Sequence, residues 1–434
     1  MDSGNFLDKH RGKGKEYYLT KDSGQMTGDT YSPYKEFINM QKLTIEDLDV
    51  KRKRVFLRVD FNVPLDENRL VTDDSRIKAA LPTINYLLSN GARLILVSHL
   101  GRPKGKASDS LSLRPVAECL EKTLEKKIVF SPTVIGTVAQ TAIDCLNPGD
   151  CLLMENIRFF PEEEKNDSQF SKDLASLVDL YVNDAFGTAH RAHASTEGIA
   201  KYFDNAACGY LIKKELEFLG KLASKPEQPY CAVIGGAKVK DKIGVITNLL
   251  DRLENVLIGG GMAYTFLKVL GKNIGQSILD QEHLDIVESM FEKAEKLNKK
   301  IHLPVDHVVS EKFDNECPVS IVEDNIPDEM MGLDIGPKTV ENYLKALSSA
   351  KTVFWNGPMG VFEMSNFQKG TFEIAKGLSE SNAVTVVGGG DSVAAVNKAN
   401  LGHLMSHIST GGGASLKFLE GKPLPGLEAL ADKG

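Results

Sequence analysis

Short apolar runs alternate with amphipathic stretches along most of the chain. From residue 55 onward, each run is rich in Val, Ile and Leu and ends in glycine or polar residues. Because nearly every position in a run is apolar, the runs are typical of strands that are covered on both faces of a sheet. The predicted strands are Val55–Val63, Leu94–Leu100, Cys151–Phe159, Leu180–Phe186, Cys231–Gly236, Val256–Gly261, Thr352–Gly357 and Val384–Gly390.

The stretches between these runs have helical periodicity. After the first strand, apolar residues recur at the i, i+3, i+4, i+7 spacing of one helix face, and Gly91 supplies a stop. This face consists of Ile77, Ala80, Leu81, Ile84, Leu87 and Leu88. Alternating strands and helices predict a parallel, doubly wound α/β sheet. A chain of 434 residues is too long for one typical core, so we expect two domains.

The boundary between the two halves is predicted near residues 205–230. Residues 213–219 resemble a connecting helix, and residues 225–229, with two prolines, indicate a loop before the next strand. Residues 1–40 are polar and rich in glycine, without the apolar core of a secretory signal. Because the regular pattern begins at Gln41, we expect residues 1–40 to be a flexible extension, either native or added for expression.

Composition narrows the class of protein. The formal net charge of −7 argues against general affinity for nucleic acid. No apolar run reaches the roughly 18 residues that a membrane helix needs. The six cysteines follow neither a C-x-x-C nor a zinc-ligand spacing, which favours reduced thiols. We therefore expect a cytoplasmic protein with no nucleic-acid or membrane partner.

Polar and cationic residues follow the predicted strands of the first half. In parallel α/β sheets ligands bind beyond the carboxyl ends of strands. Those ends carry Asp60, Asn62, His99, Arg102 and Arg158. Guanidinium groups match the oxygens of carboxylate and phosphate, so the pattern favours a site for a small anion. Two alternatives stay open: scattered arginines are more often solvated, and Asp60 with Asn62 could form the turn before a proline.

Glycine clusters mark the ends of the strands in the second half. They lie at residues 235–236, 259–261, 388–390 and 411–413. Glycine lets backbone N–H groups approach phosphate closely, and a helix N-terminus adds a favourable dipole. One cluster alone is more often a tight turn, but four favour a polyanionic ligand. Neither a G-x-x-x-x-G-K-[ST] nor a G-x-G-x-x-G motif is present, which excludes a P-loop and weakens a dinucleotide site.

Three charged residues sharpen the nucleotide interpretation. Lys238 and Lys242 follow a glycine pair at helical spacing, which predicts that they share one face at a helix start. Cations there oppose the helix dipole, and a phosphate chain would neutralise them. Asp391, just after three glycines, could hold Mg²⁺ together with phosphate oxygens, or could cap the next helix.

Together these segments closely resemble the phosphoglycerate kinase family, over residues 41–434. The most specific motifs are RVDFNVP at 58–64, SHLGRP at 98–103, GGAKVKDK at 235–242, WNGPMGVFE at 355–363 and GGGD at 388–391. Five motifs in the right order leave little room for chance. One departure is Ser392, where many members carry threonine; the hydroxyl is kept.

The resemblance implies two sets of site residues. For 3-phosphoglycerate they are Asp60, Asn62, Arg76, His99, Arg102, Arg158 and Arg191. For the nucleotide they are Ala237, Lys238, Lys242, Gly259, Gly260, Asn356, Phe362, Glu363, Gly389, Gly390, Asp391 and Ser392. Within these sets, Arg76 and Lys238 are implied as the catalytic cations and Asp391 as the ligand of Mg²⁺.

The resemblance also implies an architecture and a reaction. It implies two similar-sized Rossmann-like α/β domains: residues 41–205 for 3-phosphoglycerate and residues 206–410 for the nucleotide, with an interdomain helix at about 206–223. Residues 411–434 would return to the first domain. The implied reaction is reversible, Mg²⁺-dependent phosphoryl transfer between ATP and the carboxylate of 3-phosphoglycerate, giving ADP and 1,3-bisphosphoglycerate in glycolysis and gluconeogenesis. The enzyme would be a monomer that closes about a hinge.

Two rival functions are weighed against this one. A nicotinamide dehydrogenase would also have two doubly wound domains, but the chain lacks its glycine fingerprint and a ribose-binding acid at the expected distance. A non-catalytic interaction protein built on a kinase fold is the second alternative. Every matched catalytic position is intact, which favours an active enzyme.

Overall fold

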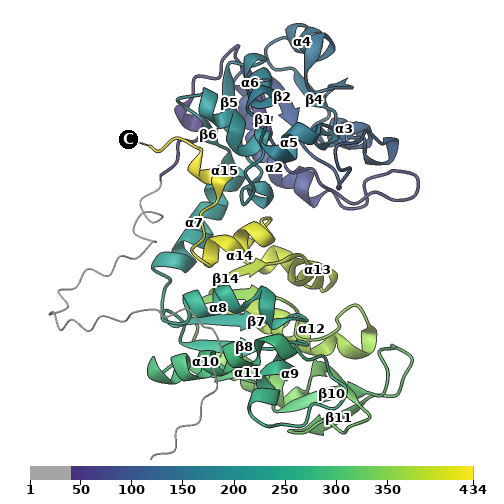
Figure 1. Cartoon of the computed structure of the whole chain (residues 1–434), viewed down its shortest axis with the longest axis vertical. Helices are drawn as coiled ribbons and strands as arrows, with labels where there is room; N and C mark the ends of the chain where they lie inside the picture. The colour runs from purple at the N-terminus through teal and green to yellow at the C-terminus, as the bar shows by residue number, and fades with distance from the viewer. Residues whose placement is uncertain (1–40, 434) are drawn as a thin grey trace, which may run out of the picture.

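Two lobes of similar construction make up the computed structural model, which describes residues 41–433 (Figure 1). The upper lobe in the view holds β1 to β6, and the lower lobe holds β7 and the later strands. The predicted flexible extension, residues 1–40, lies outside the described residues. The two α/β lobes confirm the fold class expected from the strand–helix alternation.

The first lobe is built on a six-stranded sheet in the order β3-β4-β2-β1-β5-β6, with every pair parallel. Its strands are β1 (Arg54–Arg58), β2 (Arg93–Val97), β3 (Ile128–Ser131), β4 (Cys151–Met154), β5 (Leu180–Asn183) and β6 (Ala207–Cys208). Its helices are α2 (Ser75–Ser89), α3 (Arg114–Leu124), α4 (Gly136–Asp144), α5 (Pro161–Lys165) and α6 (Ser168–Ser176). The central strands are buried, as their apolar runs predict.

The second lobe repeats this plan with a parallel sheet in the order β15-β14-β13-β7-β8-β9. Its strands are β7 (Tyr230–Ile234), β8 (Asn255–Ile258), β9 (Lys300–His302), β13 (Thr352–Asn356), β14 (Val384–Gly388) and β15 (His407–Ile408). Its helices are α8 (Ile243–Leu249), α9 (Ala263–Val269), α10 (Leu284–Lys296), α11 (Pro337–Leu347), α12 (Lys369–Ser379) and α13 (Gly390–Lys398).

A small antiparallel sheet, which the sequence did not predict, is added to the second lobe. It has the order β11-β10-β12, with β10 at Asp306–Ser310, β11 at Ser320–Glu323 and β12 at Met331–Ile335. Its strands lack the continuous apolar pattern: β11 is largely exposed. Residues of β12, and a residue of the loop that follows β10, nevertheless line a cavity described below.

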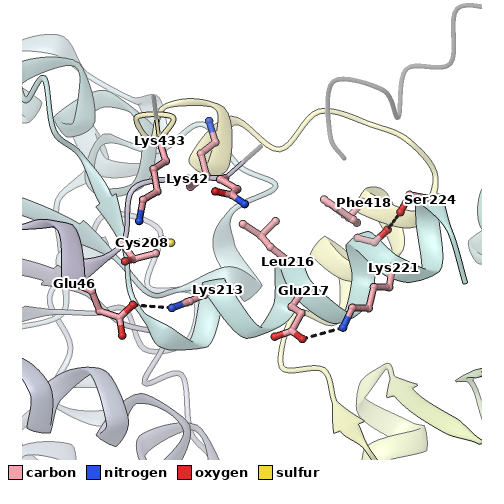
Figure 2. Close-up of a pocket in the computed structure, with 13 residues that line it drawn as sticks. Lys42, Glu46, Cys208, Lys213, Leu216, Glu217, Lys221, Ser224, Phe418 and Lys433 are labelled. Carbon is pink, nitrogen blue, oxygen red and sulfur yellow. Dashed lines mark hydrogen bonds and ion pairs between the residues drawn. The ribbon is translucent and has the colours of Figure 1, made fainter. Parts of the chain in front are cut away.

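Helix α7 (Tyr210–Ser224) connects the lobes, close to the predicted position of about 206–223. Its first turn is held by Asp184, at the end of β5, which accepts a hydrogen bond from the Ile212 N–H at 3.0 Å. One side of α7 borders a groove of about 590 Å³, and Figure 2 shows Lys213 and Lys221 in ion pairs with Glu46 and Glu217 along it.

The C-terminal segment returns to the first lobe. Helix α14 (Gly413–Leu419) lies beside α7 and α8, and the chain then passes through α15 (Pro425–Glu428) into the upper lobe (Figure 1). There Ala431 C=O accepts from the Leu43 N–H at 2.8 Å. The first sheet also includes β6, just beyond residue 205. The division into domains at 205 and 410 stays a prediction.

Candidate active site

Three cavities share lining residues with one another. A cationic cavity of about 320 Å³ lies on the first lobe. A glycine-lined cavity of about 530 Å³ lies at the end of β14, and a more apolar cavity of about 400 Å³ lies beside β12. Gly412 and Gly413 line both the first and the second cavity, and Asp391 lines both the second and the third. Each cavity therefore shares part of its wall with the next one.

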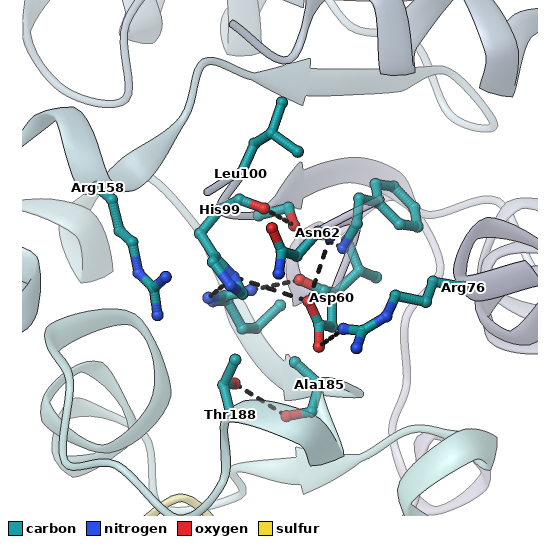
Figure 3. Close-up of polar contacts among 12 residues, drawn as sticks. Asp60, Asn62, Arg76, His99, Leu100, Arg158, Ala185 and Thr188 are labelled. Carbon is teal, nitrogen blue, oxygen red and sulfur yellow. Dashed lines mark hydrogen bonds and ion pairs between the residues drawn. The ribbon is translucent and has the colours of Figure 1, made fainter. Parts of the chain in front are cut away.

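The cationic cavity gathers every residue that the sequence implied for the acid substrate. These are Asp60, Asn62, Arg76, His99, Arg102, Arg158 and Arg191. They come together because β1, β2, β4 and β5 are neighbours in one parallel sheet, so the loops after these strands meet at one edge. Figure 3 shows Asp60 beside Arg76, with Arg158 approaching from the other side of the His99 ring.

Asp60 organises the cationic side chains around it. It pairs with Arg76 Nη1 and also accepts a bond from the Asn62 N–H at 3.3 Å, so the Asx turn and the ion pair both exist. Burial opposes ionisation, but the cations Arg76 and Arg58 hold the pKa of Asp60 below its ordinary value. The carboxylate therefore stays charged and fixes the Arg76 guanidinium at the mouth of the cavity.

Hydrogen bonds also fix Asn62, Arg158 and Arg191 in this cavity. Asn62 Oδ1 accepts from the Gly101 N–H at 2.8 Å, and Arg158 Nη1 donates to Gly101 C=O at 2.9 Å. Burial, together with nearby Arg58, lowers the pKa of Arg158 to about 10. Arg191 Nε donates to His190 Nε2 at 3.1 Å. Several guanidinium groups at one edge, one of them largely desolvated, favour an anionic ligand with more than one charged group.

The glycine-lined cavity combines a lysine, an amide and a carboxylate. Lys242 Nζ donates to Asn356 Oδ1 at the end of β13. The pKa of Lys242 is lowered because the amine is desolvated, although Asp241 and Asp391 oppose the shift. Asn356 Nδ2 is buried and has no hydrogen-bond partner among residues 41–433. A buried N–H donor of this kind beside a lysine is suited to a phosphate oxygen.

Glycine is required where the loops around this cavity cross. Gly389 has φ +90°, and a Cβ there would lie 3.0 Å from Asn356 Nδ2. Gly260 has φ +63°, and a Cβ there would lie 2.6 Å from Gly236 N. Side chains would strain the backbone at both positions and close the approach to the loop N–H groups.

The third cavity combines apolar walls with a carboxylate. Among the predicted residues, Ala237, Gly260, Glu363 and Asp391 line it. Apolar side chains supply much of the remaining wall: Ile278, Phe313, Met331, Leu333 and Val361. A largely apolar cavity next to a carboxylate can hold a base and a ribose hydroxyl.

Three predicted nucleotide residues do not line any of these cavities. Gly259 packs against Met359, and Phe362 is buried, 6.0 Å from Lys398 Nζ. Lys238 is exposed and lies near Asp280, whose pKa it helps to lower although burial of Asp280 opposes the shift. The prediction that Lys238 and Lys242 share one face of a helix is wrong. A 3-10 turn at Val239–Asp241 separates Lys238 from α8, and α8 begins only after Lys242.

Sequence reasoning missed several residues around the cavities. Phe313 lies on the loop after β10 and carried no motif signal. Glu163 and Ser195, which lie in none of the quoted motifs, form a buried network with Arg58 behind the cationic cavity. An arginine inside the apolar run of β1 was the available signal for this network, since a charged residue in a buried strand needs partners.

The residues around Asp391 fit a magnesium ion that is held mainly by phosphate. No group of three or more His, Cys, Asp or Glu in the described part of the chain could hold a metal by itself. Mg²⁺ on nucleotides needs one or two carboxylates and takes its other ligands from phosphate and water. Gly389 is the N-cap of α13 and no side chain caps that helix, so the capping alternative for Asp391 is not seen.

Comparison with known proteins decides the family. The family model described as phosphoglycerate kinase matches residues 45–422. The chain belongs to the phosphoglycerate kinase family. Proteins named phosphoglycerate kinase from Clostridium botulinum (strain Hall) and Clostridium novyi (strain NT) are each 54% identical over 399 residues, covering 91% of this chain and 100% of each relative. The family assignment excludes the dehydrogenase alternative.

Solved structures agree with this assignment. The structure of phosphoglycerate kinase from Coxiella burnetii is 40% identical, with a TM-score of 0.81, and covers 89% of this chain and 98% of that one. The enzyme from Pyrococcus horikoshii OT3 is 34% identical, with a TM-score of 0.79 and the same coverage. Within residues 41–433, no helix is long and apolar enough to cross a membrane.

Proposed function

We propose that the chain catalyses reversible phosphoryl transfer between ATP and the carboxylate of 3-phosphoglycerate, giving ADP and 1,3-bisphosphoglycerate in glycolysis and gluconeogenesis. The observation that carries this proposal is the pair Gly412 and Gly413, which lines both the cationic and the glycine-lined cavity. A phosphoryl group leaving the second cavity would meet an acceptor in the first at this loop. Membership of the phosphoglycerate kinase family supports the same reaction.

The cationic cavity binds 3-phosphoglycerate in this proposal. Its carboxylate is already ionised at neutral pH, so no general base is needed to activate it. Its phosphate lies among the arginines Arg102, Arg158 and Arg191, which hold that end of the molecule in a fixed orientation. Arg76, held by Asp60, is the residue that stabilises charge on the transferring group.

The nucleotide takes the other two cavities. Its base and ribose occupy the cavity with Phe313 and Glu363, and its phosphates contact Lys242, Asn356 and the N–H groups of residues 389–390. Asp391 would hold Mg²⁺, which when bound offsets the charge of the phosphate chain. Lys238 joins the site as a second catalytic cation if the loop at 236–242 moves, since its side chain is exposed.

Closure about α7 completes the site in this proposal. Because the acid and the nucleotide lie on different lobes, the lobes must approach for in-line transfer, and their approach excludes water as a competing acceptor. We place the 3-phosphoglycerate domain at 41–205, the nucleotide domain at 206–410 and the returning segment at 411–434. We further propose that the enzyme is a cytoplasmic monomer.

A coupled assay tests the proposed function directly. The full chain, 3-phosphoglycerate and MgATP are combined with a dehydrogenase that consumes 1,3-bisphosphoglycerate and NADH. We expect NADH to be lost only when all three components are present. Loss of ATP without loss of NADH would instead show hydrolysis, and no loss of either would reject the function.

A further inference from the structure

A buried chain of hydrogen bonds starts behind the cationic cavity and ends on His99. Arg58, on β1, is fully buried and does not line the cavity. Its Nε donates to Ser195 Oγ at 2.7 Å, and its Nη2 lies 3.2 Å from His99 Nδ1. Its Nη1 donates to the Val59 carbonyl. The guanidinium is thus held on three sides and its orientation is fixed.

The direction of each hydrogen bond follows from what an arginine can do. A guanidinium has N–H donors and no acceptor, so His99 Nδ1 must accept from Arg58 and carries no proton. Ser195 Oγ likewise accepts from Arg58, so its own proton goes to Glu163 Oε1, at 2.6 Å. The Ser195 N–H donates to Glu163 Oε2 at 2.8 Å.

The surroundings of His99 favour a neutral ring. Burial is the largest cause that lowers its pKa well below the ordinary value, and Arg58, Arg158 and Arg76 act in the same direction. Asp60 opposes them, but its Oδ1 lies 3.8 Å from Nδ1, which is too far for a hydrogen bond. A neutral imidazole without a proton on Nδ1 must carry it on Nε2.

We propose that Glu163 and Ser195 hold Arg58 so that it fixes His99 as the Nε2–H tautomer, which donates a hydrogen bond to an oxygen of the bound acid. Arg58, Ser195 and Glu163 are positioning residues, since they act through His99, which lines the cavity. The identity of the acid rests on the proposed function, but the tautomer does not. In this arrangement His99 adds a directed donor to the cavity without adding a charge.

Nitrogen-15 NMR of the ligand-free full chain tests the tautomer independently of activity. The His99 signals are assigned by their absence from His99→Gln, and long-range couplings to the ring protons identify the protonated nitrogen. We expect Nε2 to be protonated and Nδ1 to be bare at pH 7. A proton on Nδ1, or a charged ring, would overturn the proposal even if the enzyme is a fully active kinase.

Two variants test the positioning role. Ser195→Ala removes the link between Arg58 and Glu163, and we expect mixed His99 tautomers and a KM for 3-phosphoglycerate raised roughly threefold to tenfold, with the KM for ATP unchanged. Ser171→Ala is the matched control, because Ser171 is also a buried serine and its Oγ donates only to the Asp167 carbonyl among the bonds observed. It should leave both quantities unchanged.

The outcome of this pair decides the positioning role. A Ser195→Ala enzyme with the wild-type tautomer and the wild-type KM for the acid would refute it. Equal effects of Ser195→Ala and Ser171→Ala would refute it too, since they would reflect general loosening of the lobe.

Discussion

At the scale of single residues, Arg76 is the side chain whose loss should matter most for turnover. It lies at the edge of the cationic cavity and is oriented by Asp60. If it stabilises charge that develops during transfer, Arg76→Ala should lower kcat by about 10²–10³-fold and change the KM values little. Steady-state kinetics with both substrates varied measures kcat and the two KM values separately.

Arg114 provides the control for this measurement. It lies over the Phe130 ring at 4.5 Å and lines none of the three cavities. Arg114→Ala removes the same charge from the same lobe and should keep the wild-type kcat. A similar kcat for both variants would remove Arg76 from the chemistry.

Asp334, on β12, should give the fold a measurable pH dependence. It is 2% exposed and accepts from the Gly370 N–H at 2.7 Å, and its burial raises the pKa of the carboxyl to about 8. The pKa of Asp334 in the folded protein lies above its unfolded value of about 4. The contribution of this carboxyl to the free energy of unfolding is therefore fully present below pH 4, where the group is protonated in both states. This contribution is lost as the pH rises to 8, by up to about 1.4 kcal/mol per pH unit.

Urea denaturation between pH 5 and pH 8 measures this contribution. Asp334→Asn cannot titrate, so its free energy of unfolding should fall less steeply with pH than that of the wild type. The exposed Asp204→Asn serves as the control and should keep the wild-type slope. Parallel pH profiles for wild type and Asp334→Asn would contradict the assignment.

The residues predicted for the acid all line one cavity, whereas three of those predicted for the nucleotide line neither the glycine-lined nor the third cavity. Residues such as Asp60 and His99 directly follow strands, and strand ends converge at one edge of a parallel sheet. The position of Lys238 depends instead on a 3-10 turn, and Phe313 reaches its cavity from an irregular loop. Such positions depend on tertiary contacts that no local pattern contains.

At the scale of elements, the join between β14 and α13 should be sensitive to any side chain. Gly389→Ala would strain a left-handed backbone and place its Cβ against Asn356 Nδ2. We expect it to lower kcat/KM for ATP by about tenfold or more, since the loop N–H groups and the buried amide would be displaced. Initial rates at subsaturating ATP measure this ratio.

Gly91→Ala separates strain from function in the same experiment. Gly91 also has a left-handed φ, +74°, but no atom lies within 4 Å of its added Cβ. Both variants should lose on the order of 1 kcal/mol of stability. Unchanged kinetics in Gly389→Ala would show that this loop does not bind the nucleotide.

The sequence predicted the central strands of both parallel sheets and missed their edge strands. The eight apolar runs include β1, β2, β4 and β5 in the first lobe and β7, β8, β13 and β14 in the second. The missed edge strands are β6 and β15, with two residues each, β9, with three, and β3, with four. An edge strand is covered less completely and shows less of a continuous apolar pattern, so periodicity alone does not identify it.

At the scale of the whole molecule, the cleft between the lobes should close when both substrates bind. The two predicted ligands lie on different lobes joined by α7. Small-angle scattering should show a smaller radius of gyration with 3-phosphoglycerate and a non-hydrolysable ATP analogue together than with either one alone. The same radius of gyration for the free protein, for each single-ligand state and for the state with both ligands would contradict closure.

The central claim is that the cationic cavity supplies the acceptor for a phosphoryl group that leaves the glycine-lined cavity. Phosphorus-31 NMR of the full chain with MgATP and 3-phosphoglycerate tests it most directly, because an acyl phosphate has its own resonance. We predict that this resonance grows together with ADP and disappears when 3-phosphoglycerate is omitted. Formation of ADP and inorganic phosphate without an acyl phosphate would contradict the account.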